Sequence, residues 1–496
     1  MKTETKYLCI LASLYFIAEF IGICHHELWL DEAHHWLLAR ESGSVWELLQ
    51  NTQNEGHPVL WNFLLYVITR FTLNPFWMQF FHLAIATSAV VIFLRKAPFN
   101  WLFKSLFIFG YFMIFEYTLI SRNYILGLLF LFLACSIFEF RDKKFILLSV
   151  YLALAANVHL MFAVIALAIF LTLVFEQSCK ENAFRKPEFL IGALIFTIGS
   201  ALTAIQIIPS ENIQFFEHIN QMRLSEKFTK GFIALFKGLI VVPDFSSIHF
   251  WNSNYLVNFS KPLSAIAGLL LYVVPLLLFF KSSKTLFFVY TALFGTQIFF
   301  FLTQMSATRH DGITFLIVII GLWIAHCFPA DVNKLSALLN SNFAGRLKSL
   351  IVYGILIIHF FSGIYAYGMD YRYAFTSEKK INDFLKLQHL DTQTIIAANC
   401  SGTVVSPNLQ KQIFFLCAND YESFCRWNSE CAANFTPTEI TNMLDKYLKT
   451  HNWGIYLSHG TPLKPTESDF QYRFLKKFEG SIIRNNDYYL YKISKN

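Results

Sequence analysis

Charged residues are scarce in this chain. Asp, Glu, Lys and Arg make up 15% of its 496 residues, whereas roughly 25% is usual for a soluble domain. Hydrophobic residues reach 55%, and phenylalanine alone occurs 55 times. A soluble protein of this length could not bury so much apolar surface, which excludes a large soluble enzyme. We therefore expect an integral membrane protein with many α-helical spans.

The chain also lacks several patterns that mark other classes of protein. It contains neither a Walker nor a dinucleotide-binding glycine pattern, so no nucleotide cofactor is implied. Its net charge of +7 is not gathered on a basic face with interleaved aromatic residues, which argues against a nucleic-acid partner. The first apolar run is followed by an acidic, histidine-rich segment rather than by a small-residue cleavage site. We therefore interpret it as a retained first span.

About eleven apolar runs are candidates for membrane spans. They cover residues 7–24, 76–94, 101–115, 124–140, 145–158, 161–175, 189–208, 263–280, 286–302, 313–328 and 350–367. A further run, residues 58–68, is only 11 residues long, which is short for a bilayer-crossing helix. Whether this run crosses the membrane decides the orientation of everything that follows it.

The distribution of basic residues settles that orientation, because Lys and Arg accumulate in cytoplasmic loops. If residues 58–68 lie flat on the membrane, every second loop is cytoplasmic and holds the clusters Arg95, Lys96; Arg141, Lys143, Lys144; Lys180, Arg185, Lys186; Lys281, Lys284; and Lys334, Arg346, Lys348. We therefore expect residues 25–75 to form one long outer loop with interfacial helices. Residues 117–123, 209–261 and 303–311 are then also outside, and residues 1–369 form the membrane domain.

Residues 370–496 are polar and follow the last apolar run. Short β-rich runs at 394–398, 453–457 and 488–493, with a helical run at 438–449, predict a small α/β domain outside the cytoplasm. Four of the nine cysteines lie here: Cys400, Cys417, Cys425 and Cys431. An even cluster in an oxidising compartment predicts two disulfides, whose pairing stays open. A zinc site is the alternative, but the spacings lack the paired cysteines that are typical of one.

Two adjacent carboxylates, Asp31 and Glu32, follow the first span at the position where a helix would begin. The simplest interpretation is that Asp31 caps this helix and Glu32 complements its dipole. Neighbouring residues on a helix point about 100° apart, so both carboxylates cannot serve one atom. If one of them is a catalytic base, the other has a different role.

Further polar residues are expected on the same face. Glu55 and His57 are presented by a turn that Gly56 and Pro58 fix, and they could share a metal, hold a phosphate or simply be solvated. Arg122 and Arg309 open two spans and are the only basic residues of their short outer loops. Arginines at span ends often extend their side chains to the membrane interface. An anionic ligand would also explain both residues, because the planar guanidinium group of arginine donates several hydrogen bonds to a phosphate. His159 joins this set more weakly.

Taken together, these motifs resemble a known family. The pair Asp31–Glu32, the turn Gly56-His57-Pro58, the triplet Arg122-Asn123-Tyr124 and the late motif Arg309-His310 with Gly312 occur in the order found in membrane glycosyltransferases of the GT-C class. The chain is most similar to the bacterial group of lipid A aminoarabinose and galacturonosyl transferases and protein O-mannosyltransferases. The resemblance covers residues 1 to about 370. It departs from many relatives in having one proline, not two, after His57.

The resemblance implies an inverting transfer of a single sugar from a polyprenyl-phosphate carrier to a lipid, glycan or protein acceptor. It assigns the active site to the periplasmic face of a bacterial inner membrane. Asp31, beside Glu32, is the expected catalytic base, and a second set of residues would hold the donor phosphate: His57, Arg122, Tyr124, Arg309 and His310. Some relatives bind a divalent metal, for which Glu55, His57 and His159 are the candidates.

Two other functions stay open at this point. A flippase for lipid-linked sugars would place charges midway along its spans and often show internal repeats, and neither feature occurs here. A ligase that joins whole glycans would also use outer arginines. The early Asp31–Glu32 loop fits the single-sugar transferases better.

Overall fold

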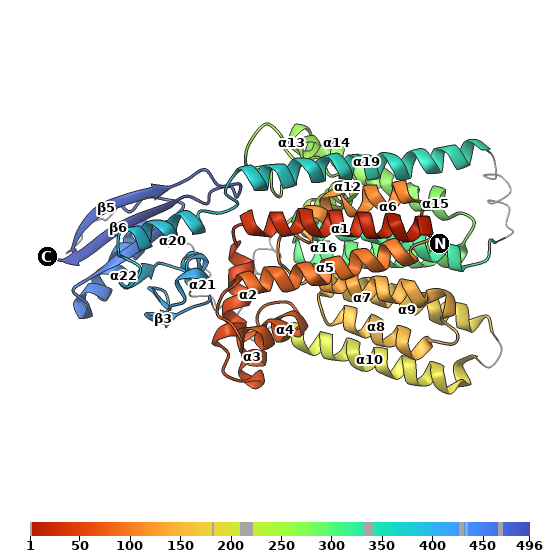
Figure 1. The fold of residues 1–496 in the computed structure, drawn as a ribbon, viewed down its shortest axis with the longest axis horizontal. Helices are drawn as coiled ribbons and strands as arrows, with labels where there is room; N and C mark the ends of the chain where they lie inside the picture. The colour runs from red at the N-terminus through yellow and green to blue at the C-terminus, as the bar shows by residue number, and fades with distance from the viewer. Residues whose placement is uncertain are drawn as a thin grey trace.

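The computed structural model describes residues 2–180, 183–208, 222–331, 342–425, 431, 435–464 and 470–496. A bundle of roughly parallel and antiparallel helices forms one end of an elongated molecule, and a lobe with a β-sheet forms the other (Figure 1). We call the end of the bundle that faces this C-terminal lobe the head end. It carries three short helices, α2 (Leu30–Glu41), α3 (Val45–Asn51) and α4 (Leu60–Thr69).

Eight helical segments in the described residues are long and apolar enough to cross a membrane. They are α1 (Lys2–His25), α5 (Phe76–Lys96), α9 (Leu160–Ser178), α10 (Pro187–Ile207), α14 with α15 (Lys261–Leu270 and Val274–Phe279), α16 (Ser283–Thr303), α17 (Thr308–Ile324) and α19 (Asn342–Arg372). Each coincides with one of the predicted runs. The structure is therefore that of a multi-span membrane protein.

The predicted count of eleven spans is not confirmed, because three runs form shorter helices. Residues 101–115 give α6 (Trp101–Ile108) and then a π-helical turn, Phe112–Glu116. Residues 124–140 and 145–158 give α7 (Tyr124–Ile137) and α8 (Phe145–Ala156). The interruption after α6 lies where α19 crosses, and a Cβ on Gly363 would come within 2.8 Å of the Phe109 carbonyl oxygen. Glycine at this position therefore allows α19 to pack directly against the end of α6.

The segment expected to be the second large outer loop, residues 209–261, contains more helix than its polarity suggested. Residues 209–221 lie outside the described part of the chain, as does Lys334. In the described part of this segment, α12 (Leu224–Leu239) packs against α14, α16 and α17, and α13 (Tyr255–Phe259) follows it. A Cβ on Gly238 would lie 2.1 Å from the Asp311 carbonyl oxygen. Glycine at this position therefore allows α12 to pack directly on the first turn of α17.

The C-terminal lobe contains the predicted α/β fold. Its six-stranded sheet has the order β3-β2-β1-β4-β6-β5, in which β1 pairs in parallel with β2 and β4 and the other pairs are antiparallel. The strands are β1 (Ile395–Ala397), β2 (Ile413–Phe415), β3 (Asp420–Glu422), β4 (Trp453–His459), β5 (Phe470–Phe478) and β6 (Tyr488–Lys495). Helix α20 (Glu378–Leu387) packs against alternate residues of β1 and β4, and α22 (Pro437–Thr450) packs against the residues between them. Both faces of the sheet are therefore covered.

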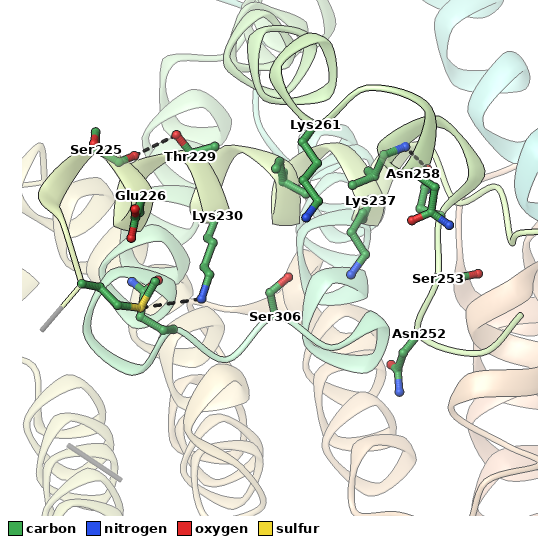
Figure 2. A pocket seen from close by; sticks show the side chains of 15 residues that line it. Ser225, Glu226, Thr229, Lys230, Lys237, Asn252, Ser253, Asn258, Lys261 and Ser306 are labelled. Atoms are coloured by element: carbon green, nitrogen blue, oxygen red, sulfur yellow. Dashed lines mark hydrogen bonds between the residues drawn. The ribbon is translucent and has the colours of Figure 1, made fainter. Parts of the chain in front are cut away.

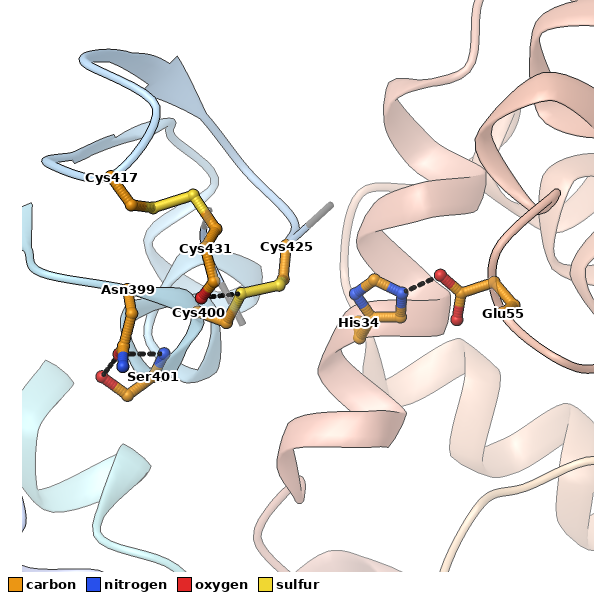
Figure 3. Close-up of a disulfide and its surroundings, with 8 residues drawn as sticks. All are labelled: His34, Glu55, Asn399, Cys400, Ser401, Cys417, Cys425 and Cys431. Carbon is orange, nitrogen blue, oxygen red and sulfur yellow. Dashed lines mark hydrogen bonds and ion pairs between the residues drawn. A yellow bond between two sulfur atoms is a disulfide. The ribbon is translucent and has the colours of Figure 1, made fainter. Parts of the chain in front are cut away.

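Two disulfides link the four cysteines of the lobe, as predicted. Cys400 bonds to Cys425, and Cys417 bonds to Cys431. The residue before Cys425, Phe424, packs in one hydrophobic cluster with Leu37 and Leu38 of α2. Figure 3 shows this disulfide region facing α2 across the boundary between lobe and bundle. The oxidised lobe thus supports the helix that begins beside Asp31.

A candidate active site at the head end

Glu32 closes the start of α2 and ties it to other parts of the bundle. Its Oε2 accepts a hydrogen bond from the backbone N–H of Trp29, 2.8 Å away. Its Oε1 accepts a second from the backbone N–H of Ser121, at 2.6 Å. The expectation that Asp31 caps this helix is therefore wrong, because Trp29 occupies the cap position and Glu32 supplies the oxygen. Glu32 is fully buried, and its bonds give it a positioning role.

His26 extends this network to the last span. Its Nε2 lies 3.2 Å from Glu32 Oε2, and its Nδ1 lies 3.0 Å from a carboxylate oxygen of Asp370, near the end of α19. Burial alone would lower the pKa of His26, but the two carboxylates raise it to about 10. His26, held between two carboxylates, therefore connects the segment after α1 with the end of α19.

Asp31 points away from Glu32 and meets both predicted arginines. It forms an ion pair with Nη1 of Arg122, and Nη2 of Arg309 lies 3.7 Å from the same carboxylate oxygen. The indole ring of Trp29 lies beneath both guanidinium groups, 5.5 Å from that of Arg122 and 4.7 Å from that of Arg309. Burial would raise the pKa of Asp31, but the two arginines hold it below its usual value. The side chain keeps 23% of its surface exposed, so a substrate can reach it.

Four aromatic side chains line the other side of the arginines. The rings of His57 and His159 are 4.5 Å apart, and those of His159 and His310 are 5.9 Å apart. The Tyr124 hydroxyl lies 3.3 Å from His159 Nε2, and His57 Nε2 lies 3.5 Å from Arg122 Nη2. The structure therefore brings together every residue that the sequence assigned to phosphate binding.

Two histidines of this cluster, His57 and His159, have pKa values below the usual value of a histidine. Burial, reinforced by the charge of Arg122, lowers the pKa of His57 to about 3. Burial and the neighbouring His57 and His310 rings lower the pKa of His159 well below its usual value. A neutral imidazole can donate one hydrogen bond and accept another. These rings can therefore bind an anion by hydrogen bonding without adding charge.

Several polar atoms of this cluster are buried and have no hydrogen-bond partner in the described part of the chain. They are Nε of Arg122, Nε of Arg309, Nδ1 of His57 and Nδ1 of His310. Buried donors of this kind are normally satisfied, and each exception calls for an explanation. An oxygen-rich ligand among the arginines and histidines would supply the missing partners.

The predicted metal set does not assemble. Glu55 Oε1 lies 2.8 Å from His34 Nε2, and Figure 3 shows this pair opposite the disulfide region of the lobe. The described residues contain no group of three or more His, Cys, Asp and Glu side chains that could hold a metal ion. The two histidines alone make an incomplete donor set, so no step is assigned to a metal.

Sequence reasoning missed several residues of the site. Trp29 was not singled out, although it lies two positions before Asp31. Trp251 packs edge-on against Trp29 at 4.7 Å, and its Nε1 donates to Glu116 at 3.2 Å. Asp311 forms a buried ion pair with Lys237 at 2.7 Å. A carboxylate at the edge of an apolar run was the signal available for Glu116 and Asp311.

Comparison with known proteins defines the fold. The architecture is that of a multi-span membrane protein with a charged site at the head end of the bundle and an α/β lobe that faces this end (Figure 1). No family model matches the chain, and no curated protein matches it in sequence. Among solved structures, it is similar to the crystal structure of ArnT from Cupriavidus metallidurans bound to undecaprenyl phosphate. The TM-score is 0.52, the identity is 10%, and the match covers 98% of each chain. The protein therefore has an ArnT-like fold over its whole length.

Proposed function

We propose that this protein is an inverting glycosyltransferase that moves a single sugar from a polyprenyl-phosphate carrier to a lipid, glycan or protein acceptor. The observation that carries the proposal is the convergence of Arg122 and Arg309 on Asp31. Two arginines with unpartnered nitrogens suit a phosphate, and the carboxylate between them suits a general base. The ArnT-like fold supports this assignment, because that structure was solved with undecaprenyl phosphate.

In the proposed reaction, the donor phosphate replaces Asp31 as the ion-pair partner of Arg122 and Arg309. Losing these partners raises the proton affinity of the Asp31 carboxylate, which makes it a stronger base. Asp31 then accepts the proton of the acceptor hydroxyl while the oxygen attacks the anomeric carbon from the side opposite the phosphate. The bond from the anomeric carbon to the phosphate oxygen breaks, and the electron pair leaves with the lipid phosphate.

Charge on the leaving phosphate is stabilised by the residues around it. Arg122 and Arg309 supply charge-assisted hydrogen bonds, and the imidazole rings of His57 and His310 add further hydrogen-bond donors. Tyr124 orients His159 through its hydroxyl. Glu32 is a positioning residue. Its hydrogen bonds to the backbone N–H groups of Trp29 and Ser121 hold the start of α2, which carries Asp31, against the segment that carries Arg122.

The proposed orientation places this site at the periplasmic face of a bacterial inner membrane. Two features of the chain support it: basic clusters lie in alternate loops, and the lobe carries two disulfides, which persist in oxidising compartments. Native cysteines provide a test. Cys24, beside the head end, should react with a membrane-impermeant maleimide in spheroplasts, whereas Cys179, after α9, should react only after permeabilisation. The reverse pattern would contradict the orientation.

The function itself is tested by transfer of label. Purified protein would be incubated with radiolabelled polyprenyl-phosphate sugars and total membrane lipids, with Asp31→Asn as the inactive variant. Asp142→Asn is the matched control, because it removes an exposed carboxylate that pairs with Lys180 outside the site. Label should move to a new lipid, glycan or protein with wild type and the control only. No transfer by folded wild-type protein across a broad panel of donors would favour a flippase or ligase.

A further inference from the structure

A cavity lined by several lysines lies beside the candidate active site. It has a volume of about 540 Å³ and is formed by α12, α13 with the segment before it, the start of α14 and the residues before α17. Figure 2 shows the side chains that line it, among them three lysines on the walls and Ser306 between them. The sequence analysis assigned no function to these residues.

The lysines are the main charges of this cavity. Lys230 and Lys237 are seven positions apart on α12, and Lys261 begins α14. Lys237 is buried and paired with Asp311 at 2.7 Å. Within the described residues, neither Lys230 nor Lys261 takes part in an ion pair, and the Lys230 ammonium contacts only the Met222 sulfur, at 3.7 Å. Among the described lining residues, Glu226 is the one that carries a carboxylate. Positive charge is therefore in excess.

Snorkelling to the membrane surface explains a single terminal lysine, such as Lys261, by itself. It does not explain why three lysines from two helices line one cavity together with short polar side chains. Asn252, Ser253, Asn258 and Ser306 lie in the same lining. Amide and hydroxyl groups of this kind bind sugar or glycerol hydroxyls, whereas ammonium groups bind phosphate or carboxylate as point charges.

The first turn of α17 separates this cavity from the candidate active site. On the cavity side, Lys237 pairs with Asp311, and the Ser306 hydroxyl donates to the same carboxylate at 3.1 Å. Asn252 Oδ1 accepts from the Thr308 backbone N–H at 3.0 Å. On the other side, Arg309 faces Asp31. A ligand in the cavity would thus be separated from the proposed donor site by the width of one helix, about 10–12 Å.

From this arrangement we propose that the lysine cavity binds an anionic, hydroxyl-bearing headgroup, carrying phosphate or carboxylate, which belongs to the acceptor. The acceptor role rests on the proposed function, whereas binding of the headgroup does not. The start of α14, a candidate span, forms one wall, and Ile233 and Val257 add apolar surface. A headgroup that stays attached to a membrane lipid can therefore enter from the side.

Binding is tested on the full chain in detergent by native mass spectrometry and calorimetry. The probes are dihexanoyl-phosphatidylglycerol, which is anionic and carries hydroxyls, and zwitterionic dihexanoyl-phosphatidylcholine. The variant is Lys230→Gln with Lys261→Gln. The control is Lys227→Gln with Lys446→Gln, which removes the same charge but no lining residue. We expect wild type and the control to bind the anionic lipid about tenfold more tightly than the double cavity variant.

Two further measurements show whether the ligand is a free anion or a lipid headgroup, and whether it binds in the cavity or at the proposed donor site. Glycerol phosphate alone should bind to the same lysines if the ligand is a free anion, and more weakly than phosphatidylglycerol if the lipid contributes. Undecaprenyl phosphate should bind the cavity variant as it binds wild type, while Arg122→Gln should lose undecaprenyl phosphate and keep phosphatidylglycerol. Equal binding of the anionic lipid by wild type and the cavity variant, or equal binding of the two phospholipids by wild type, would overturn the proposal. Neither result depends on observing sugar transfer.

Discussion

Two clusters of charge lie side by side at the head end, and they differ in how completely they are bonded. In the first, His26 uses both ring nitrogens on Asp370 and Glu32, and both oxygens of Glu32 accept hydrogen bonds. In the second, Asp31 holds two arginines that each keep a buried nitrogen without a partner in the described residues. A saturated cluster maintains architecture, whereas an unsaturated one is prepared for a ligand.

The comparison also explains why two adjacent carboxylates have different roles. Successive residues on a helix point about 100° apart, so Glu32 faces the Ser121 backbone while Asp31 faces the arginines. Asp31 is partly exposed, whereas Glu32 is fully buried. The saturated cluster should therefore govern stability, and the unsaturated one should govern donor binding and turnover.

The largest effect on stability is expected from Glu32→Gln. It leaves the buried His26 imidazolium with one carboxylate instead of two, and breaking a buried pair costs about 3–5 kcal/mol. Thermal unfolding in detergent should shift strongly downward, and any loss of transfer should follow the loss of folded protein. Asp31→Asn measured in parallel should lower the unfolding temperature less, because the Asp31 side chain is partly exposed. If the two variants were equally stable, the proposed division of roles would be wrong.

Arg122→Lys and Arg309→Lys should chiefly weaken donor binding. Lysine keeps the charge but cannot form the two parallel hydrogen bonds of a guanidinium, and bonds to charged groups contribute about 1.5–3 kcal/mol. The KM for the donor should therefore rise roughly 10- to 100-fold, with little change in the unfolding temperature. Arg141 pairs with Glu176 elsewhere in the bundle, so Arg141→Lys is the matched control. An unchanged KM for both site variants would remove the arginines from donor binding.

The saturated cluster should also make stability depend on pH. The pKa of His26 is raised from its unfolded value to about 10 in the folded protein. Its contribution is therefore fully present below about pH 6.5 and is lost as the pH rises toward the folded value. Unfolding temperatures measured across this range should fall more steeply for wild type than for His26→Gln. Parallel curves for the two proteins would contradict the assigned pKa.

The smallest effect is expected at Trp29, whose ring supports both guanidinium groups. Cation–π contacts contribute about 0.5–2 kcal/mol, so Trp29→Leu should raise the donor KM severalfold, and Trp29→Phe should recover part of the loss. Trp46 is largely exposed on α3, and Trp46→Leu serves as the control. Identical kinetics for Trp29→Leu and Trp29→Phe would mean that the aromatic face does not hold the arginines.

Much of the site could be predicted from the sequence, because charged residues are rare in this chain and those near span ends stand out. Asp31, Arg122 and Arg309 were identified in that way, His57 was identified from the turn that presents it, and the structure brings the four together. The partners of Glu32 could not be identified, since Ser121 is 89 positions away in the chain and His26 reaches Asp370 across 344 positions. Contacts over such separations depend on how the spans pack, which periodicity does not reveal.

The errors have similar physical causes. Glu55 was grouped with His57 because a turn presents both, but His34 on the facing helix pairs with Glu55 instead. The span count is not confirmed, because composition predicts the length of an apolar run and does not show where a helix ends inside it, as α6 does at Ile108. The packing of α12 into the bundle depends on Gly238, whose effect appears only once α17 is beside it.

The account is tested most directly by measuring donor binding and sugar transfer together in Asp31→Asn. Because Asp31 and the donor phosphate compete for Arg122 and Arg309, the variant should bind undecaprenyl phosphate at least as tightly as wild type. Its rate of transfer should nevertheless fall by about 10²- to 10⁴-fold, the usual contribution of a general base. Retained transfer would show that Asp31 is not the base, and loss of lipid binding would show that it does not compete for the arginines.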